Sequence, residues 1–269
     1  MKPTPHPEVN ALLATLQAGI DRALGDKLVG FYLYGSLVTG EFDPGLSDID
    51  VAAVLTADLD EAEFARLHRM HDAIAAANPR WDDRIEVGYI SEALVRAFDP
   101  LGTIAVISPG EPFHPRAAES SWLFNLHVVR EQGIALCGPP LSSLRDPITA
   151  SALNAALQGA MRKWREWLPE ADPVMHAKPQ AYVVLTMCRA LYAQAHGVSV
   201  SKRRAARWAA DAFPVWSATI RDALAWYDAT GDPDIDLAAT RATTLRFADV
   251  ATRLIMEVDQ GQSPTPETS

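Results

Sequence analysis

The chain has 269 residues, of which 48% are hydrophobic and 22% are charged, and its formal net charge is -10. This composition is typical of a globular protein with a sizeable core and excludes a wholly disordered chain. No apolar stretch of about 18 residues occurs, so we expect no membrane-spanning helix. A general grip on nucleic acid phosphates requires a basic face, and the acidic balance disfavours that partner.

The two cysteines, Cys137 and Cys188, are too few for a disulfide framework or a zinc site. We expect both to be reduced thiols in a cytoplasmic protein. The N-terminal residues lack the apolar run of a secretory signal, which agrees with that location.

Hydrophobic periodicity predicts two parts of different character. In the first part we expect strands over 28–34, 48–55 and 84–90 and helices over 9–24 and 59–77. In the second part, strand patterns nearly disappear, and we expect helices over 150–168, 181–196, 201–213, 216–230 and 238–258. We therefore predict an α+β fold with a small mixed sheet flanked by helices over 1–147, an all-α helical bundle over 148–258 and a flexible tail over 259–269.

Three polar features of the first part indicate phosphate and metal chemistry. Gly35 and Ser36 follow directly on a predicted strand, where exposed N–H groups and a hydroxyl can hold phosphate oxygens. Asp48 and Asp50 are two residues apart on the next predicted strand, so both carboxylates lie on one face. Two such acids repel each other unless a cation lies between them, and oxygen ligands suit Mg²⁺. Glu86, on a third predicted strand, could complete a two-metal site or act as a general base toward a hydroxyl.

Each feature has a structural explanation when taken alone. A Gly-Ser pair after a strand often forms a simple turn, and an Asp-x-Asp at a strand start often caps or faces solvent. Glu86 alone is typical of an exposed strand residue. Eleven residues separate Ser36 from Asp48, a span that can bring the acids back beside the turn, so the combination favours one shared site.

A resemblance to a known family connects these features. The segments Tyr34-Gly35-Ser36 and Ser47-Asp48-Ile49-Asp50 resemble the signature of the DNA polymerase β-type nucleotidyltransferase superfamily. The segments 183–189, 201–202, 205–209 and 214 resemble the helical domain of streptomycin/spectinomycin adenylyltransferases, and 134–139 resembles the segment that joins their two domains. The resemblance covers roughly residues 25 to 230.

The resemblance implies an enzyme that moves AMP from ATP to a hydroxyl of a small cationic acceptor, most simply an aminoglycoside, and releases pyrophosphate. The implied catalytic and metal-binding residues are Asp48, Asp50 and Glu86, with Glu86 as the base and two magnesium ions as the cofactor. The implied nucleotide-binding residues are Gly35, Ser36, Ser47, Arg189, Lys202 and Tyr227, of which Tyr227 is not in register with the family's tyrosine. The implied partners are ATP and the acceptor, without nucleic acid or membrane, and we expect a monomer.

The start of the helix that carries Lys202 also favours an anionic ligand. Lys202, Arg203 and Arg204 oppose the helix macrodipole there, so a bound phosphate would offset their repulsion. The alternatives for these cations and for Arg189 are a solvated basic turn and a structural ion pair.

The acceptor is less well determined than the nucleotide. Lys178-Pro179-Gln180 stands where antibiotic-modifying members carry acidic and amide side chains that grip ammonium groups. Adenylylation of another metabolite or of a protein hydroxyl, and a nucleotide-binding module without turnover, therefore remain alternatives. We expect His68 and His71 to be a surface pair rather than metal ligands, and we expect five tryptophans to lie mostly in the core: Trp164, Trp167, Trp208, Trp216 and Trp226.

Overall fold

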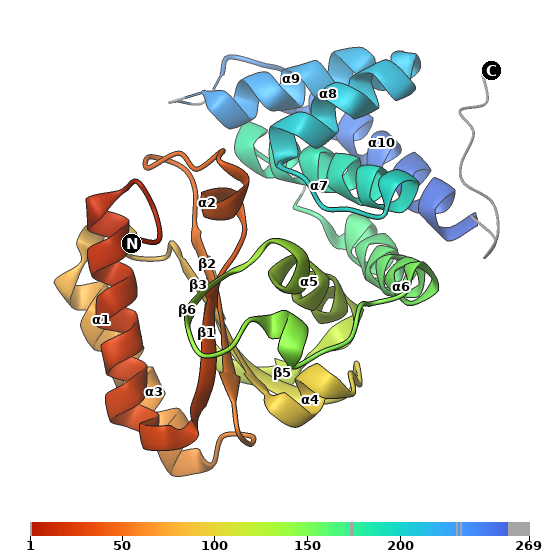
Figure 1. Cartoon of the computed structure of the whole chain (residues 1–269). Helices are drawn as coiled ribbons and strands as arrows, with labels where there is room; N and C mark the ends of the chain where they lie inside the picture. The colour runs from red at the N-terminus through yellow and green to blue at the C-terminus, as the bar shows by residue number, and fades with distance from the viewer. Residues whose placement is uncertain (1, 173–174, 230, 232, 258–269) are drawn as a thin grey trace. The chain divides into compact units, whose positions relative to one another are not determined.

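The computed structural model of the chain describes residues 2–172, 175–229, 231 and 233–257. It divides into two compact units, Met1–Ile148 and Thr149–Ser269. The first unit combines a sheet with helices and the second is built of helices (Figure 1), so the predicted α+β fold class is confirmed. The tail expected over 259–269 lies outside the described residues.

Six strands of the first unit form one mixed sheet in the order β5-β4-β3-β2-β1-β6. The pair β2 and β3 is parallel, whereas the other neighbouring pairs are antiparallel. The strands are β1 (Leu28–Leu33), β2 (Ile49–Leu55), β3 (Ile85–Ser91), β4 (Thr103–Ser108), β5 (Glu111–Ala117) and β6 (Ile134–Cys137).

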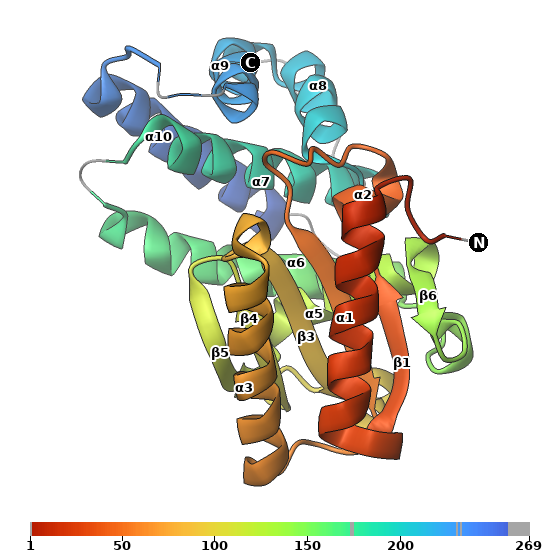
Figure 2. The same ribbon diagram turned by 90° about the vertical axis from the view of Figure 1, so that its left-hand side faces the viewer.

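Helices cover both faces of this sheet (Figures 1 and 2). Successive side chains of a strand point to opposite faces, so Val51 and Ala53 of β2 pack with α1 and α3, whereas Ala52 and Val54 pack with α4 and α5. The helices of this unit are α1 (Pro7–Leu24), α2 (Ser36–Thr39), α3 (Glu61–Ala77), α4 (Glu92–Arg96) and α5 (Glu119–Gln132).

The three predicted strands are present as β1, β2 and β3, but β4, β5 and β6 were not predicted. β5 contains Pro112 and Pro115, which weaken a strand pattern and are tolerated because β5 is an edge strand. β6 has only four residues, of which Ile134 and Ala135 are exposed. The segment that resembles a domain connection therefore also closes the opposite edge of the sheet through its pairing with β1.

The second unit is built around α7, whose side chains are the most extensively buried of its helices and which packs against α8, α9 and α10. Ser201 caps α8 by accepting a hydrogen bond from the Arg204 N–H at 3.2 Å, and Gly197 ends α7 with a φ of 69°. Within the described part of the chain, no helix is both long and apolar enough to cross a membrane. The helices are α6 (Ala150–Trp167), α7 (Ala177–His196), α8 (Lys202–Ala212), α9 (Ser217–Asp228) and α10 (Leu237–Glu257).

Short 3₁₀ turns complete both units. They are η1 (Gly25–Lys27), η2 (Pro79–Trp81), η3 (Leu141–Ser143), η4 (Leu168–Glu170) and η5 (Pro214–Trp216).

Candidate functional site

The parallel pairing of β2 and β3 brings two of the predicted acids together. Asp50 and Glu86 are direct register partners, so their side chains leave the same face of the sheet on neighbouring strands. This is the face that carries α4 and α5, because Asp50 has the same parity as Ala52. The predicted strand over 48–55 includes Asp48, but in the structure Asp48 lies one residue before β2.

The turn after β1 can only be made by a glycine. Gly35 has a φ of 70° and a ψ of -145°, a conformation that residues with a side chain rarely adopt. A Cβ at this position would lie 1.9 Å from the Asp50 Oδ2 atom, so the Asp50 carboxylate fills the space that the missing side chain leaves. The Tyr34 N–H also donates to the Asp50 carbonyl at 3.0 Å. The Asp50 carboxylate therefore lies against the turn where Ser36 begins α2.

Two hydroxyl groups hold the Glu86 carboxylate. The Tyr34 hydroxyl donates to Oε1 at 3.0 Å, and the Ser108 hydroxyl donates to Oε2 at 3.1 Å. One carboxylate oxygen is thus oriented by the residue that follows β1, two strands away from β3, and the other by the last residue of the neighbouring strand β4. Sequence reasoning assigned no role to either donor, because Tyr34 was seen only as part of the Gly35-Ser36 motif and Ser108 lies on an unpredicted strand.

Arg84 fixes the loop that carries Ser47 and Asp48. Its guanidinium donates to the Pro44 carbonyl at 3.1 Å and to the Ser47 carbonyl, while its own carbonyl accepts from the Ile49 N–H at 2.9 Å. The Ser47 hydroxyl is buried and accepts a hydrogen bond from the Asp43 N–H at 3.0 Å. Ser47 therefore shapes the loop, and its hydroxyl proton is not used in that bond.

Trp122 covers the sheet face at Gly88, two residues along β3 from Glu86. It is only 2% exposed, and a Cβ at Gly88 would lie 1.8 Å from its ring, so the glycine makes room for the indole. Trp122 is therefore a core residue of the first unit. It places an apolar wall beside the part of β3 that carries Glu86.

The donor set beside Gly35 suits a magnesium ion. In the described part of the chain, no three His, Cys, Asp or Glu side chains are grouped so that they could hold a metal by themselves. Magnesium commonly takes only one or two carboxylates and completes its shell with phosphates and water. Asp48 and Asp50 supply such oxygens, with Asp50 in the space that a Cβ at Gly35 would fill. The residues present fit this ion, whereas the three-acid site that includes Glu86 stays a prediction.

The histidine pair does not form a surface metal site. His71 is 4% exposed, and its Nε2 atom lies 2.9 Å from the Tyr89 hydroxyl. Burial lowers the pKa of His71 from 6.5 to about 4. Our expectation of a surface pair is therefore wrong for His71, which is packed among aromatic rings, and right for the half-exposed side chain of His68.

In the second unit, the predicted cation Lys202 lies between two tyrosines. Its Nζ atom is 5.1 Å from the ring centre of Tyr182 and 5.2 Å from that of Tyr227. Arg203 also lies over the Tyr227 ring at 5.4 Å and pairs with Asp228 at 2.7 Å. Lys202 and Tyr227, two of the residues implied to bind the nucleotide, are thus neighbours.

Arg189 lies on α7 and is partly buried. Its predicted contact with phosphate and the alternative, a structural ion pair with the first unit, both stay predictions.

Comparisons with known proteins match both units. A nucleotidyltransferase domain family matches residues 20–98, and the family described as the aminoglycoside adenylyltransferase C-terminal domain matches residues 143–251. The first unit thus matches a nucleotidyltransferase domain, and the chain is similar to the aminoglycoside adenylyltransferases. It is accordingly a nucleotidyltransferase, as the resemblance implied.

Individual relatives support the same assignment. This nucleotidyltransferase is 28% identical over 219 residues to an aminoglycoside (3'') (9) adenylyltransferase of Shigella flexneri and to one of Escherichia coli, with 77% of this chain and 80% of each relative covered. A crystal structure of a spectinomycin adenyltransferase of Enterococcus faecialis with ATP and spectinomycin has a TM-score of 0.71. At 16% identity over 89% of this chain and 98% of the other, that structure shows a shared fold.

The segment before Val183 does not have the side chains that a role in binding the antibiotic requires. Gln180 is fully buried, and its amide donates to the carbonyls of Met175 at 2.7 Å and Leu237 at 3.3 Å. Its oxygen accepts from the Thr244 hydroxyl at 3.1 Å. Gln180 in this nucleotidyltransferase is therefore a core residue that joins α7 to α10, so it cannot reach an acceptor.

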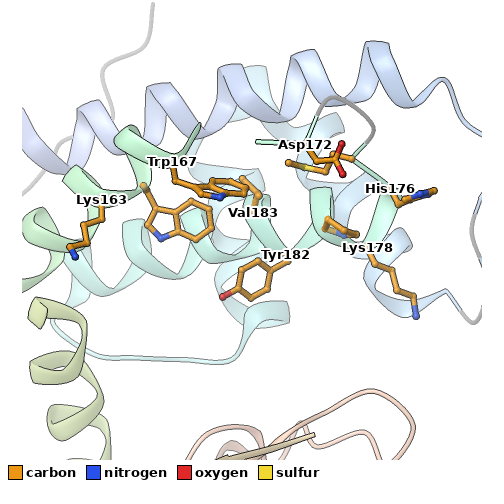
Figure 3. A pocket seen from close by; sticks show the side chains of 10 residues that line it. Lys163, Trp167, Asp172, His176, Lys178, Tyr182 and Val183 are labelled. Atoms are coloured by element: carbon orange, nitrogen blue, oxygen red, sulfur yellow. The ribbon is translucent and has the colours of Figure 1, made fainter. Parts of the chain in front are cut away.

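Lys178 and Pro179 instead line a cavity of about 670 Å³ in the second unit (Figure 3). Trp164, Trp167 and Tyr182 line the same cavity. Of the five tryptophans predicted to lie mostly in the core, only Trp226 is buried, Trp167 is 43% exposed, and Trp164, Trp208 and Trp216 are half-buried, so the prediction is wrong for most of them. Helical spacing could not distinguish these positions, because all of them fit an apolar stripe.

Proposed function

We propose that this nucleotidyltransferase moves AMP from ATP to a hydroxyl of a small acceptor, with Mg²⁺ as its cofactor. The observation that carries the proposal is the register of Asp50 with Glu86 beside a glycine turn that only Gly35 can make. A carboxylate beside a phosphate-binding turn and a second, hydrogen-bonded carboxylate on the next strand are the two groups that the reaction needs. Aminoglycosides are the first acceptor class to test, because the relatives are named as aminoglycoside adenylyltransferases.

The residues of the chain have separate tasks in this proposal. Ser36, Ser47 and the backbone at Gly35 bind the triphosphate, and Arg189 and Lys202 bind phosphate oxygens from the second unit. Asp48 and Asp50 would hold Mg²⁺, which neutralises the charge of the triphosphate when it is bound.

Glu86 acts as the general base. The acceptor oxygen forms a bond to the α-phosphorus, the bond from that phosphorus to the pyrophosphate oxygen breaks, and the hydroxyl proton passes to the Glu86 carboxylate. The hydrogen bonds from Tyr34 and Ser108 keep the carboxylate in one orientation, so less freedom is lost when the acceptor binds. Pyrophosphate leaves with the electron pair of the broken bond.

The test measures pyrophosphate release in a mixture of ATP, Mg²⁺ and a panel of aminoglycosides. We expect release with wild type and at least 100-fold less with Glu86→Gln, which keeps the shape of the side chain but cannot take up the proton. Glu92→Gln, a change on α4 away from the site, is the matched control and should retain full activity. Full activity of Glu86→Gln would refute the assigned base.

Binding without turnover is the competing function. Calorimetry should then show ATP binding, while no acceptor in the panel leads to pyrophosphate release. If the acceptor is instead a protein hydroxyl, a protein in a lysate should gain the mass of the transferred AMP. Gel filtration of the protein tests the monomer that we infer for the active form.

A further inference from the structure

Another cavity lies within the first unit, between the start of α3 and the sheet. Its volume is about 260 Å³. A cavity of about 150 Å³ is large enough to hold benzene, so this space suits a ligand with one ring. We call it the α3 pocket and define it by six of the residues that line it: Leu55, Asp58, Glu61, Phe64, Tyr89 and Ser91.

The α3 pocket lies at the opposite end of β2 and β3 from the two acids of the candidate site. The register that pairs Asp50 with Glu86 also pairs Leu55 with Ser91, five residues further along both strands. At about 3.3 Å per residue, the two ends are roughly 16 Å apart. Figure 2 shows that the chain enters α3 at the end of the sheet opposite α2. A ligand in the α3 pocket is therefore separate from the candidate site and is not the acceptor of the proposed reaction.

Aromatic rings form much of the inner wall of the pocket. Tyr89 belongs to the core on the sheet face that carries α1 and α3, and it is only 2% exposed. Phe64, near the start of α3, stacks on Phe113, with ring centres 4.5 Å apart and planes at 11°. The Tyr89 ring meets Phe113 edge to face, with ring centres 5.7 Å apart. Phe113 thus holds both rings that line the pocket, so an aromatic ligand finds preformed rings to pack against.

Ser91 contributes a buried hydroxyl to the same pocket. It points to the same face of β3 as Tyr89, two residues before it, and is 5% exposed. It stands at the N-cap position of α4 but makes no capping hydrogen bond. Within the part of the chain that the structure describes, this hydroxyl has no hydrogen-bond partner, although buried polar groups are nearly always paired. A ligand that brings a hydroxyl to Ser91 would supply the missing bond.

Carboxylates surround the mouth of the pocket, which Asp58, Asp60 and Glu61 line. Asp60 caps α3 by accepting a hydrogen bond from the Glu63 N–H at 2.7 Å. Among the described residues, the exposed carboxylates of Asp58 and Glu61 have no hydrogen bond or ion pair. The nearby Lys27 ammonium pairs with Glu63 at 2.5 Å, so a different carboxylate matches its charge. Three carboxylates outweigh the partial charge of about +0.5 at the start of a helix, and the mouth attracts a cation.

We propose that the α3 pocket binds a small aromatic amine that carries a hydroxyl on its ring. The ammonium group lies at the carboxylates of Asp58 and Glu61, and the ring packs on Phe64 and Tyr89. The ring hydroxyl bonds the Ser91 side chain. The proposal does not depend on nucleotidyl transfer, because the pocket contains none of the residues assigned to that reaction.

Calorimetry of the full-length wild type at low ionic strength tests the pocket with tyramine, which joins an ammonium group to a hydroxylated ring. We expect saturable binding of one tyramine per chain, and a higher midpoint of thermal unfolding when the site is filled. Phloretate has the same hydroxylated ring but a carboxylate in place of the amine, so it should bind at least tenfold more weakly. Equal binding of the two compounds, or no saturable binding of tyramine, would overturn the proposal.

Acid variants locate the ammonium group. Asp58→Asn combined with Glu61→Gln should weaken tyramine binding at least fivefold, because both carboxylates lose their charge. Asp72→Asn is the matched control, since it removes a 71% exposed carboxylate of α3 outside the pocket and should bind as wild type does. Glu86→Gln removes a carboxylate of the candidate site and should also bind tyramine as wild type does. A loss in Glu86→Gln, or none in the double variant, would refute the assigned site.

Ser91→Ala tests whether this hydroxyl meets the ligand. Phenethylamine is tyramine without the ring hydroxyl, and the wild type should bind it about fivefold more weakly than tyramine. Ser91→Ala should remove this difference, because no hydroxyl at position 91 then distinguishes the two compounds. A purely structural effect would instead weaken both compounds equally. An equal loss of both, or an unchanged preference for tyramine in Ser91→Ala, would overturn the placement of the ligand hydroxyl at Ser91.

Discussion

Lowering the pH from 7 to 5 tests the burial of His71 in the first unit. The imidazole is 4% exposed on α3, and its ring contacts Tyr89 and Phe113. Burial, with a smaller contribution from His68, lowers its pKa from 6.5 to about 4. Below pH 6.5 the unfolded chain therefore binds a proton that the folded chain does not bind. Stability that is fully present above pH 6.5 is lost as the pH falls toward 4.

These two pKa values determine the size of the effect. The free energy of unfolding should fall by about 2 kcal/mol between pH 7 and pH 5 because of this residue, and by about 3 kcal/mol at pH 4. Urea unfolding at each pH measures the total, and His71→Gln provides the comparison because an amide can still bond the Tyr89 hydroxyl without titrating. The wild type should lose about 2 kcal/mol more than His71→Gln between pH 7 and pH 5.

Two results would refute this reasoning. The first is an imidazole NMR titration of His71 with a midpoint near 6.5 in the folded protein. The second is an equal loss of unfolding free energy in wild type and His71→Gln over the same pH range. Carboxylates that titrate in both proteins cancel in the comparison, so the difference reports on this one group.

Three substitutions test other parts of the structure. Gly35→Ala forces a strained φ and a 1.9 Å contact with the Asp50 carboxylate, so we expect a loss of roughly 1–3 kcal/mol in thermal unfolding and at least 100-fold less pyrophosphate release; wild-type activity would contradict this. Ser108→Ala removes one donor to the Glu86 carboxylate and should lower kcat by roughly 10- to 150-fold at an unchanged KM for ATP, since such bonds contribute about 1.5–3 kcal/mol; a change in KM alone would contradict it. Gln180→Leu removes two buried hydrogen bonds and a partly buried one, and should destabilise the protein by about 2–3 kcal/mol in urea unfolding without weakening ATP binding, whereas a higher acceptor KM in a protein of full stability would show a binding role instead.

Local patterns in the sequence predicted the elements that carry most of the candidate site. The apolar runs around β1, β2 and β3 and the five long helices are each specified by periodicity within one segment. The two-residue period of a strand also predicted a face shared by Asp48 and Asp50, but Asp48 lies one residue before β2, where that period does not apply. A short edge strand with two prolines, such as β5, has no comparable signal, because its neighbours in the sheet decide whether it forms.

The sequence by itself therefore determined where the glycine turn and the strands beside it form, since each depends on residues close together in the chain. Only the tertiary structure decided that Asp50 is in register with Glu86, that Ser108 bonds the carboxylate and that Tyr182 lies against Lys202. Each of these contacts joins different secondary-structure elements, and its partner is selected by the packing and register of whole elements. A repeat of two or 3.6 residues carries no information about that selection.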